Sequence, residues 1–277
     1  MQDWQALVEK SAGEFYMYCK NLTTGAAIAR NETARLETAS VIKLPILLAV
    51  LDKVQRRELS LRQSVHVRRA DVGKHGSGVM KYFYLHQSFE LYNLLVLMTS
   101  VSDNVATNAI IRLIGRNTVN QFMQSLGFSQ TELTAEKLDF PAGFSLESSP
   151  GVGLTTPKEM ATLVERLMNG ELLDQANTKI AMKLLQQVQA SSFQSRLPRR
   201  KIKKFGSKTG GLFDDTKPLK VMNDAGYIID ADGNRYVFTL FSTLPIDRRY
   251  RQLDLDADIT FSKVAARLFH DLSSVEK

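Results

Sequence analysis

One helix that is apolar on nearly every side constrains this fold more than any other feature. From Ser40 to Val54 hydrophobic residues occupy almost its whole circumference; they are Val41, Ile42, Leu44, Ile46, Leu47, Leu48, Val50, Leu51 and Val54. Such a helix has no face for solvent, so other elements must surround it. A chain of 277 residues, 44% of them hydrophobic, supplies a core of this size without a metal or disulfide staple. Because Cys19 is the single cysteine, the chain cannot form an internal disulfide. The pattern around Cys19 predicts that it lies in a buried strand.

Strand patterns occur at the two ends of the chain and helix patterns lie between them. The predicted strands are 14–19, 26–30, 204–207, 225–229 and 236–242. Between residues 89 and 185 the pattern is helical throughout, and 259–268 predicts a closing amphipathic helix. We expect an α+β fold, with an antiparallel sheet built from both chain ends and flanked by helices, plus an all-helical domain.

This order of elements predicts two domains. Residues 1–40 and 195–277 would form the sheet domain and residues 41–194 the helical domain, with the active site at their interface. The longest apolar run, Ile46 to Leu51, is far shorter than the roughly 20 residues that span a bilayer, so no membrane span is expected. Residues 1–10 lack the basic start, apolar stretch and cleavage site of a secretory signal.

The net charge of +7 favours anionic partners without specifying one. Six basic residues crowd nine positions, and they are Arg196, Arg199, Arg200, Lys201, Lys203 and Lys204. No aromatic residues alternate with them to stack on bases, so we expect a solvated loop and no nucleic-acid partner. The four histidines, His66, His75, His86 and His270, show no ligand spacing, and neither a metal nor a cofactor is expected.

Two polar residues, Ser40 and Lys43, open the buried helix. Their i,i+3 spacing places the hydroxyl and the amine on one helix face, within reach of each other. Because apolar surroundings disfavour the charged amine, its pKa is driven down, and Lys43 can act as a base for Ser40. A capping serine and a lysine that extends to solvent would explain the same pair without catalysis.

Two more polar clusters interrupt apolar sequence. Ser102-Asp103-Asn104 lies between two helical patterns, where these residue types also suit a helix N-cap. Lys208-Thr209-Gly210-Gly211 follows a strand pattern, where a simple glycine turn is the alternative. The three clusters together, on a helix start, an interhelical loop and a strand, are the S-x-x-K, S-D-N and K-T-G set of class A β-lactamases and penicillin-binding proteins.

The sequence therefore resembles the class A β-lactamases and their penicillin-binding relatives, from about Gly13 to Phe269. Supporting matches are 38–45, 76–80, 97–100, 155–157, 160–161 and 223–224. The resemblance implies an antiparallel sheet flanked by helices and joined to a helical domain, which agrees with the organisation expected above. It also implies that no metal or cofactor is used.

On this resemblance Ser40 is the nucleophile and Lys43 its proton acceptor, while Ser102 passes a proton to the leaving nitrogen. The backbone N–H groups of Ser40 and Gly211 would form the oxyanion hole, whose donors are each worth about 3–4 kcal/mol in the transition state. These four residues would carry acylation.

Substrate binding follows from the same resemblance. Asn104 would hold the substrate's amide side chain, and Lys208, Thr209 and Gly210 would bind its carboxylate end. A second cationic contact is expected from one of Arg248, Arg249 and Arg251, although a solvated turn explains these arginines equally well.

The glutamate that deacylates class A enzymes has no counterpart in the expected loop. Pairing Thr131 and Leu133 with the family's own residues puts Lys137 at the glutamate position. The family's loop-pinning arginine and aspartate fall on Ala135 and Gly153, so their salt bridge is missing as well. Three carboxylates remain as deacylation bases, and they are Glu136, Asp139 and Glu147. The absence of any base is a fourth alternative.

These observations predict a serine β-lactamase-type hydrolase that opens β-lactams through a Ser40 acyl-enzyme, with slow deacylation. The alternatives are a D-alanyl-D-alanine peptidase or esterase acting on peptidoglycan-like substrates, and a penicillin-binding sensor that stays acylated. A β-lactam or a peptidoglycan-derived molecule is the expected small-molecule partner. Such substrates imply a periplasmic or secreted location.

Overall fold

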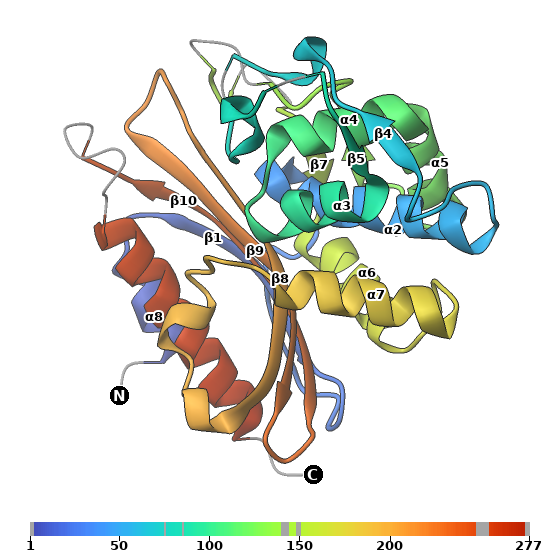
Figure 1. Ribbon diagram of the computed structural model, residues 1–277. Helices are drawn as coiled ribbons and strands as arrows, with labels where there is room; N and C mark the ends of the chain where they lie inside the picture. Colours follow the sequence, from blue (N-terminus) through green and yellow to red (C-terminus); the bar gives the residue numbers. More distant parts are fainter. Residues whose placement is uncertain are drawn as a thin grey trace.

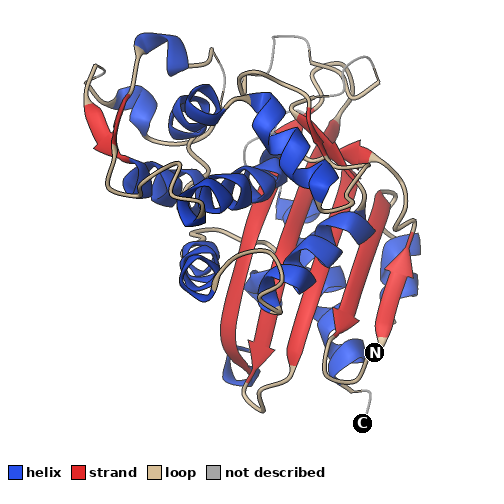
Figure 2. Cartoon of the chain, turned by 90° about the vertical axis from the view of Figure 1, so that its right-hand side faces the viewer, coloured by secondary structure: helices blue, strands red, loops and turns tan. Residues whose placement is uncertain are grey.

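Strands from both ends of the chain form one five-stranded antiparallel sheet in the computed structural model, which describes residues 3–74, 76–84, 86–139, 144–147, 151–247 and 255–274. The strand order is β2-β1-β10-β9-β8 (Figure 2). The strand bounds are β1 Glu14–Asn21, β2 Ala27–Arg30, β8 Ile202–Phe213, β9 Leu219–Asp230 and β10 Arg235–Pro245. The predicted fold class is confirmed, because β1 pairs with β10 along its whole length and so joins the two chain ends.

Helices cover both faces of this sheet (Figure 1). On one face lies α8 (Leu255–Ser273), together with the short α1 (Trp4–Glu9). Phe261, Val264 and Leu268 of α8 are buried in one core cluster with strand residues such as Phe15 and Phe238. Cys19 lies in the same cluster at 1% exposure, as expected for a buried strand residue.

The other face packs against the helical part of the chain, whose centre is α2. The bounds are η1 Ala39–Ile42, α2 Lys43–Gln55, α3 Leu91–Ser100, α4 Asn104–Ile114, α5 Arg116–Ser125, α6 Pro157–Met168 and α7 Gln175–Gln186. Every residue from Leu44 to Leu51 is buried. The prediction of a central buried helix is therefore confirmed, except that a 3₁₀ turn precedes the α-helix. None of the helices in the described ranges is long and apolar enough to span a membrane.

The middle of the chain contains short strands, although its sequence pattern predicted only helix between residues 89 and 185. Two small sheets interrupt it, with β3 (Leu36–Glu37), β7 (Gly153–Thr155) and β6 (Glu132–Leu133) in one and β4 (Ser64–His66) and β5 (Ser88–Glu90) in the other. Strands of two or three residues are too short to show a period of two. Short 3₁₀ turns add η2 Arg69–Asp71, η3 Met80–Tyr82, η4 Gln194–Arg196 and η5 Arg199–Lys201. The division into domains at residues 40 and 195 stays a prediction.

Strand β8 does not end at the Lys208–Gly211 cluster but continues through it to Phe213. It is the edge strand beside β9, and η1 lies against it. A Cβ atom on Gly210 would lie 2.6 Å from the Thr38 carbonyl oxygen and 2.9 Å from the Ser40 nitrogen. The close approach of the two backbones therefore requires glycine at position 210, and this glycine does not mark a turn.

Replacing Gly210 by alanine should push β8 away from η1, because the three nearest atoms that the new Cβ would meet all belong to backbone. We expect a loss of about 1–3 kcal/mol in the free energy of unfolding, measured by urea denaturation. Gly211→Ala is the matched control, since its Cβ would meet only the Val221 carbonyl at an ordinary 3.5 Å. Equal losses in the two variants would contradict the close approach.

Candidate active site

Ser40 and Lys43 lie one turn apart where η1 passes into α2. Lys43 is the first residue of α2 and is fully buried, and its Nζ is 3.0 Å from the Ser40 Oγ. Ser40 itself is only partly buried. The i,i+3 contact expected from the sequence is thus present, with the hydroxyl on the open side and the amine on the closed side.

The Lys43 amine has four oxygen neighbours. Besides Ser40 Oγ, they are the Ser102 carbonyl at 2.8 Å, Ser102 Oγ at 3.0 Å and Asn104 Oδ1 at 2.7 Å. An ammonium group has three hydrogens to donate, so two of the four oxygens must share one of them. In the neutral form the amine donates two hydrogens, and its lone pair can accept the Ser40 hydroxyl hydrogen.

Burial and a second cation favour that neutral form. Desolvation, with the positive charge of Lys208 as the next cause, holds the pKa of Lys43 well below its usual value, and Asp103 opposes the shift. A lysine with a lowered pKa beside a hydroxyl can take the hydroxyl proton as a general base.

Ser102 lies between the two lysines, in the loop from α3 to α4. Its Oγ is 3.0 Å from Lys43 Nζ and 3.1 Å from Lys208 Nζ. Lys208 is fully buried in β8 and also donates to the Thr209 carbonyl at 2.7 Å. Burial lowers the pKa of Lys208 to about 8, while Asp224 on β9 acts in the opposite direction. The Ser102 hydroxyl is therefore placed to exchange a proton with either amine.

Asp103 and Asn104 fix the loop that carries Ser102. One Asp103 oxygen accepts the Ala106 N–H at 3.0 Å and caps α4, and the other accepts the N–H groups of Val79 and Met80 at 2.6 and 2.8 Å. The Asn104 amide bridges Lys43 and the Leu138 carbonyl, the latter at 3.4 Å. Asp103 thus orients the loop, although the sequence suggested only that it suited a cap.

Thr209, Gly210 and Gly211 follow Lys208 along the edge of the sheet. Thr209 is partly exposed, Gly210 is buried against η1 and Gly211 is exposed. Since β8 has a sheet partner on one side only, its free edge runs past the start of the Ser40 helix. The structure brings together all three motifs that the sequence singled out.

Two of the three candidate deacylation bases are paired with cations outside the Ser40, Lys43 and Ser102 cluster. Glu136 is exposed and pairs with Arg116 at 3.0 Å, and Glu147 is exposed and pairs with Lys217. Neither carboxylate hydrogen-bonds a residue of the Ser40, Lys43 and Ser102 cluster in the described part of the chain. Their role as deacylation bases stays a prediction, and each is held by a cation on another element. Asp139 is partly buried, and its N–H donates to the Lys137 carbonyl at 3.0 Å.

Lys137, which the sequence pairs with the family's glutamate, has its amine held by another loop. Its Nζ donates to the Val72 carbonyl at 2.7 Å. The residue held next to the site is Leu138, which is buried and whose N–H donates to Asn108 Oδ1 at 2.7 Å. Asn108 lies one turn after Asn104 on α4. A second amide four residues after Asn104 was the signal that sequence reasoning missed.

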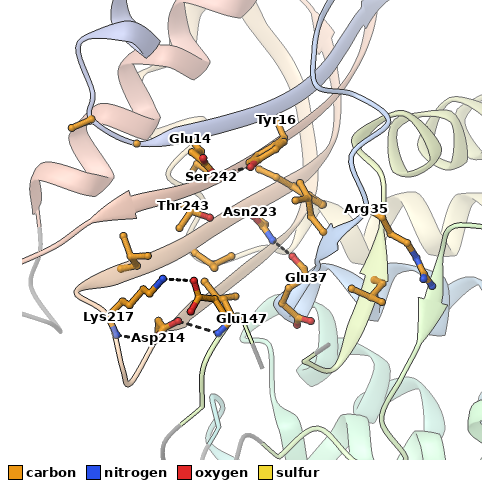
Figure 3. Close-up of a pocket in the computed structure, with 18 residues that line it drawn as sticks. Glu14, Tyr16, Arg35, Glu37, Glu147, Asp214, Lys217, Asn223, Ser242 and Thr243 are labelled. Carbon is orange, nitrogen blue, oxygen red and sulfur yellow. Dashed lines mark hydrogen bonds and ion pairs between the residues drawn. The ribbon is translucent and has the colours of Figure 1, made fainter. Parts of the chain in front are cut away.

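A pocket of about 850 Å³ adjoins the start of η1 without including Ser40 or Lys43 (Figure 3). The Glu147 and Lys217 side chains point toward each other at one side of it. Across the pocket Asn223 donates to the Glu37 carbonyl at 2.9 Å. Glu37 is a second residue that sequence reasoning missed, because only the fold places its carboxylate at the beginning of η1.

Glu37 supports the backbone just before Ser40. Its Oε1 accepts the N–H groups of Ala39 and Val152 at 3.0 and 3.2 Å. Its Oε2 is buried and has no hydrogen-bond partner in the described part of the chain. Burial raises the pKa of Glu37 to about 8, against the backbone hydrogen bonds, which lower it.

Other residues considered from the sequence lie outside the described residues. These are Arg248, Arg249 and Arg251, considered as a second cationic contact. The basic cluster at residues 196–204 is split between η4, η5 and the start of β8. The absence of a nucleic-acid partner stays a prediction.

The convergence of S-x-x-K, S-D-N and K-T-G on one buried cluster is the arrangement that class A β-lactamases share with penicillin-binding proteins. The comparisons agree with this class. The chain belongs to the β-lactamase enzyme family, whose model matches residues 1–271.

Curated relatives are distant. The chain is 23% identical over 243 residues to β-lactamase VEB-1 of Pseudomonas aeruginosa, a match that covers 82% of this chain and 80% of that protein. It is 29% identical over 109 residues to the β-lactamase regulatory protein BlaB of Streptomyces cacaoi. This second match covers 39% of the chain but only 35% of BlaB.

Solved structures share the whole fold. A β-lactamase from Sphaerobacter thermophilus superposes with a TM-score of 0.83 at 25% identity, over 99% of this chain and 98% of that one. PBP-A superposes with a TM-score of 0.80 at 23% identity, over 98% and 96% of the two chains. A point mutant of PBP-A has been solved as an acyl-enzyme complex with penicillin G.

Glu37→Gln should stabilise the protein at alkaline pH. Since the pKa of Glu37 is raised from 4.5 to about 8, the unfolded chain loses this proton first, and the stability that Glu37 contributes disappears as the pH rises through that window. Glutamine keeps the amide oxygen as an acceptor and cannot ionise. We expect the variant to gain about 1–3 kcal/mol over the wild type between pH 5 and pH 8.5, in urea denaturation at both values. A constant difference across this range would contradict the raised pKa.

Proposed function

We propose that the protein is a serine hydrolase of the β-lactamase type that opens β-lactams through an acyl-enzyme at Ser40. The observation that carries the proposal is the position of the buried Lys43 amine, 3.0 Å from both the Ser40 and Ser102 hydroxyl oxygens. One amine between two hydroxyls can accept a proton from the first and return it through the second.

In the acylation step the Ser40 Oγ attacks the lactam carbonyl while neutral Lys43 takes the hydroxyl proton. The carbon–nitrogen bond of the tetrahedral intermediate then breaks, and the leaving nitrogen receives a proton through Ser102. The product is an ester on Ser40. The N–H groups of Ser40 and Gly211 would stabilise the oxyanion that forms in between.

Substrate recognition is assigned to the remaining residues of the cluster. Lys208 and Thr209 would bind the substrate carboxylate, with the Gly210 backbone beside them, and Asn104 would bind the amide side chain. Support comes from the Lys208 ammonium, which lies 3.1 Å from Ser102 Oγ and so can hold an anionic group next to the reacting bond.

Release of the acyl group is proposed to be slow. Glu136 and Glu147, two of the candidate bases, are paired with Arg116 and Lys217, and Lys137 donates to a backbone carbonyl. This placement also favours a second candidate function, a penicillin-binding protein or D-alanyl-D-alanine peptidase with the same nucleophile. Either activity implies a periplasmic or secreted protein.

Ser40→Ala should abolish covalent labelling by penicillin, because Ser40 is the proposed nucleophile and its hydroxyl lies 3.0 Å from the Lys43 amine. Turnover should fall by a factor on the order of a million, as for loss of an activated nucleophile. Intact-protein mass spectrometry during incubation with a penicillin measures the adduct. Ser195→Ala, on the distant turn η4, is the control and should label normally. An adduct on the Ser40→Ala variant would overturn the assignment, and release of D-alanine but not penicilloate would favour the peptidase.

The second-order rate constant of acylation should fall above pH about 8. The pKa of Lys208 is lowered to about 8, so this side chain loses its charge above that pH and no longer attracts the substrate carboxylate. The decline should approach tenfold per pH unit. In Lys208→Arg the cation persists at every accessible pH, so the alkaline decline should vanish even where the rate is lower. An identical decline in both proteins would assign it to another group.

A burst of one product equivalent per enzyme should precede a slow steady state. The reason is that deacylation needs a base about 2.6–3.2 Å from the attacking water, directly or through a second water. Stopped-flow traces with a chromogenic cephalosporin measure both phases. Linear progress from the first turnover, faster than about 100 per second, would show that an efficient base is present after all.

A further inference from the structure

The exposed apolar surface of this protein is concentrated in one short segment. Among the described residues the exposed large hydrophobic side chains are Val79, Tyr82, Phe83 and Tyr84, at 41, 79, 44 and 88% exposure. All four lie within six consecutive positions, which we name the aromatic strip, residues 79–84. Single exposed apolar residues are ordinary, but a contiguous group of this kind marks an interaction site.

The aromatic strip is anchored to the rest of the protein. The Asp103 carboxylate accepts the N–H groups of Val79 and Met80, and the Met80 side chain is completely buried. At the other end the Phe83 ring packs on Phe89, with centroids 6.5 Å apart. The protein therefore presents the two tyrosines outward from a fixed base.

The sequence around the aromatic strip is basic. Between Leu59 and Phe89 the sequence has five arginines and lysines against a single acid, Asp71. Asp71 is buried and bridged by Arg112 at 2.9 Å, so it offers no negative charge to solvent. The five cations are all exposed, and they are Arg62, Arg68, Arg69, Lys74 and Lys81. Lys81 lies 5.2 Å from the centre of the Tyr82 ring.

We propose that the aromatic strip and the exposed cations that flank it in the sequence dock the protein on the surface of an anionic phospholipid bilayer. Tyrosine and phenylalanine rings insert at the level of the headgroups, and lysine and arginine at the same surface are attracted to anionic lipids. An uncharged glycan would stack on the rings but leave the excess positive charge without a partner. A bilayer with anionic headgroups uses both properties.

The location of the aromatic strip gives docking a consequence for the site. Asp103, which anchors the strip, lies between Ser102 and Asn104 in the chain. The cyan-to-teal segment that contains the strip lies at the upper end of Figure 1, at the opposite end from both termini. Docking would hold the catalytic cluster close to the lipid surface and direct α8 and the termini away from it.

Cosedimentation of the full chain with lipid vesicles tests this proposal. We expect binding to vesicles with 30% phosphatidylglycerol at least tenfold tighter than to pure phosphatidylcholine, and weaker in 0.5 M salt. The triple variant Tyr82→Ser, Phe83→Ser, Tyr84→Ser should bind at least tenfold more weakly. The single variant Tyr84→Ser, at the most exposed position, should lose part of the binding even if the triple variant folds poorly, which its thermal midpoint will show.

A charge-matched pair of variants identifies the surface. Arg69→Glu with Lys74→Glu should remove the preference for phosphatidylglycerol, whereas Arg200→Glu with Lys203→Glu, the same change of net charge in the second basic cluster, should retain it. Equal losses in both pairs would reduce the effect to overall charge and overturn the proposal. Failure to bind vesicles, with or without binding to insoluble glycan, would also overturn it. Penicillin labelling is read separately, so failure of the proposed activity would leave this result intact.

Discussion

The structure depends on the burial of two lysine amines beside one serine hydroxyl. Lys43 and Lys208 are both fully buried, and each lies within 3.1 Å of Ser102 Oγ. Burial lowers the pKa of both amines, and the positive charge of Lys208 lowers that of Lys43 further. The two sides of the site come from distant parts of the chain, α2 and the edge strand β8. The central helix and the sheet must pack together before this electrostatic arrangement can exist.

Most of this architecture could be predicted from the sequence because the long elements carry strong periodic signals. The buried helix expected at residues 40–54 is η1 and α2, and the strands expected at 14–19 and 26–30 are β1 and β2. The extension of β8 through Gly210 could not be predicted, since a glycine pair indicates a turn unless the backbone of η1 is known to lie against it. The small sheets were missed for a similar reason, because their pairing is decided by tertiary contacts.

The nucleophile side of the site was predictable and the deacylation side was not. Ser40 and Lys43 are three residues apart, so helix geometry alone brings them together. Glu136 and Glu147 are exposed, and their partners depend on where Arg116 and Lys217 lie in the fold. Lys137 donates to the Val72 carbonyl, whereas the backbone of its neighbour Leu138 is hydrogen-bonded to Asn104 and Asn108 of α4. Long-range pairing of this kind leaves no local pattern.

Backbone strain supports the view that the site is built in advance of the substrate. Ala39 and Ser102 have positive φ angles of 46° and 56°, a conformation that costs a residue other than glycine about 1–2 kcal/mol. Each is held by a buried ionisable side chain. Glu37 accepts the Ala39 N–H, and Lys43 donates to the Ser102 carbonyl. The strain thus falls on the residue before the nucleophile and on the proposed proton shuttle. If the backbone at Ala39 relaxed, the Glu37 carboxylate would lose a hydrogen-bond donor. If the backbone at Ser102 relaxed, the Lys43 amine would lose an acceptor. The charges of the buried groups and the positions of the Ser40 and Ser102 hydroxyls therefore depend on each other.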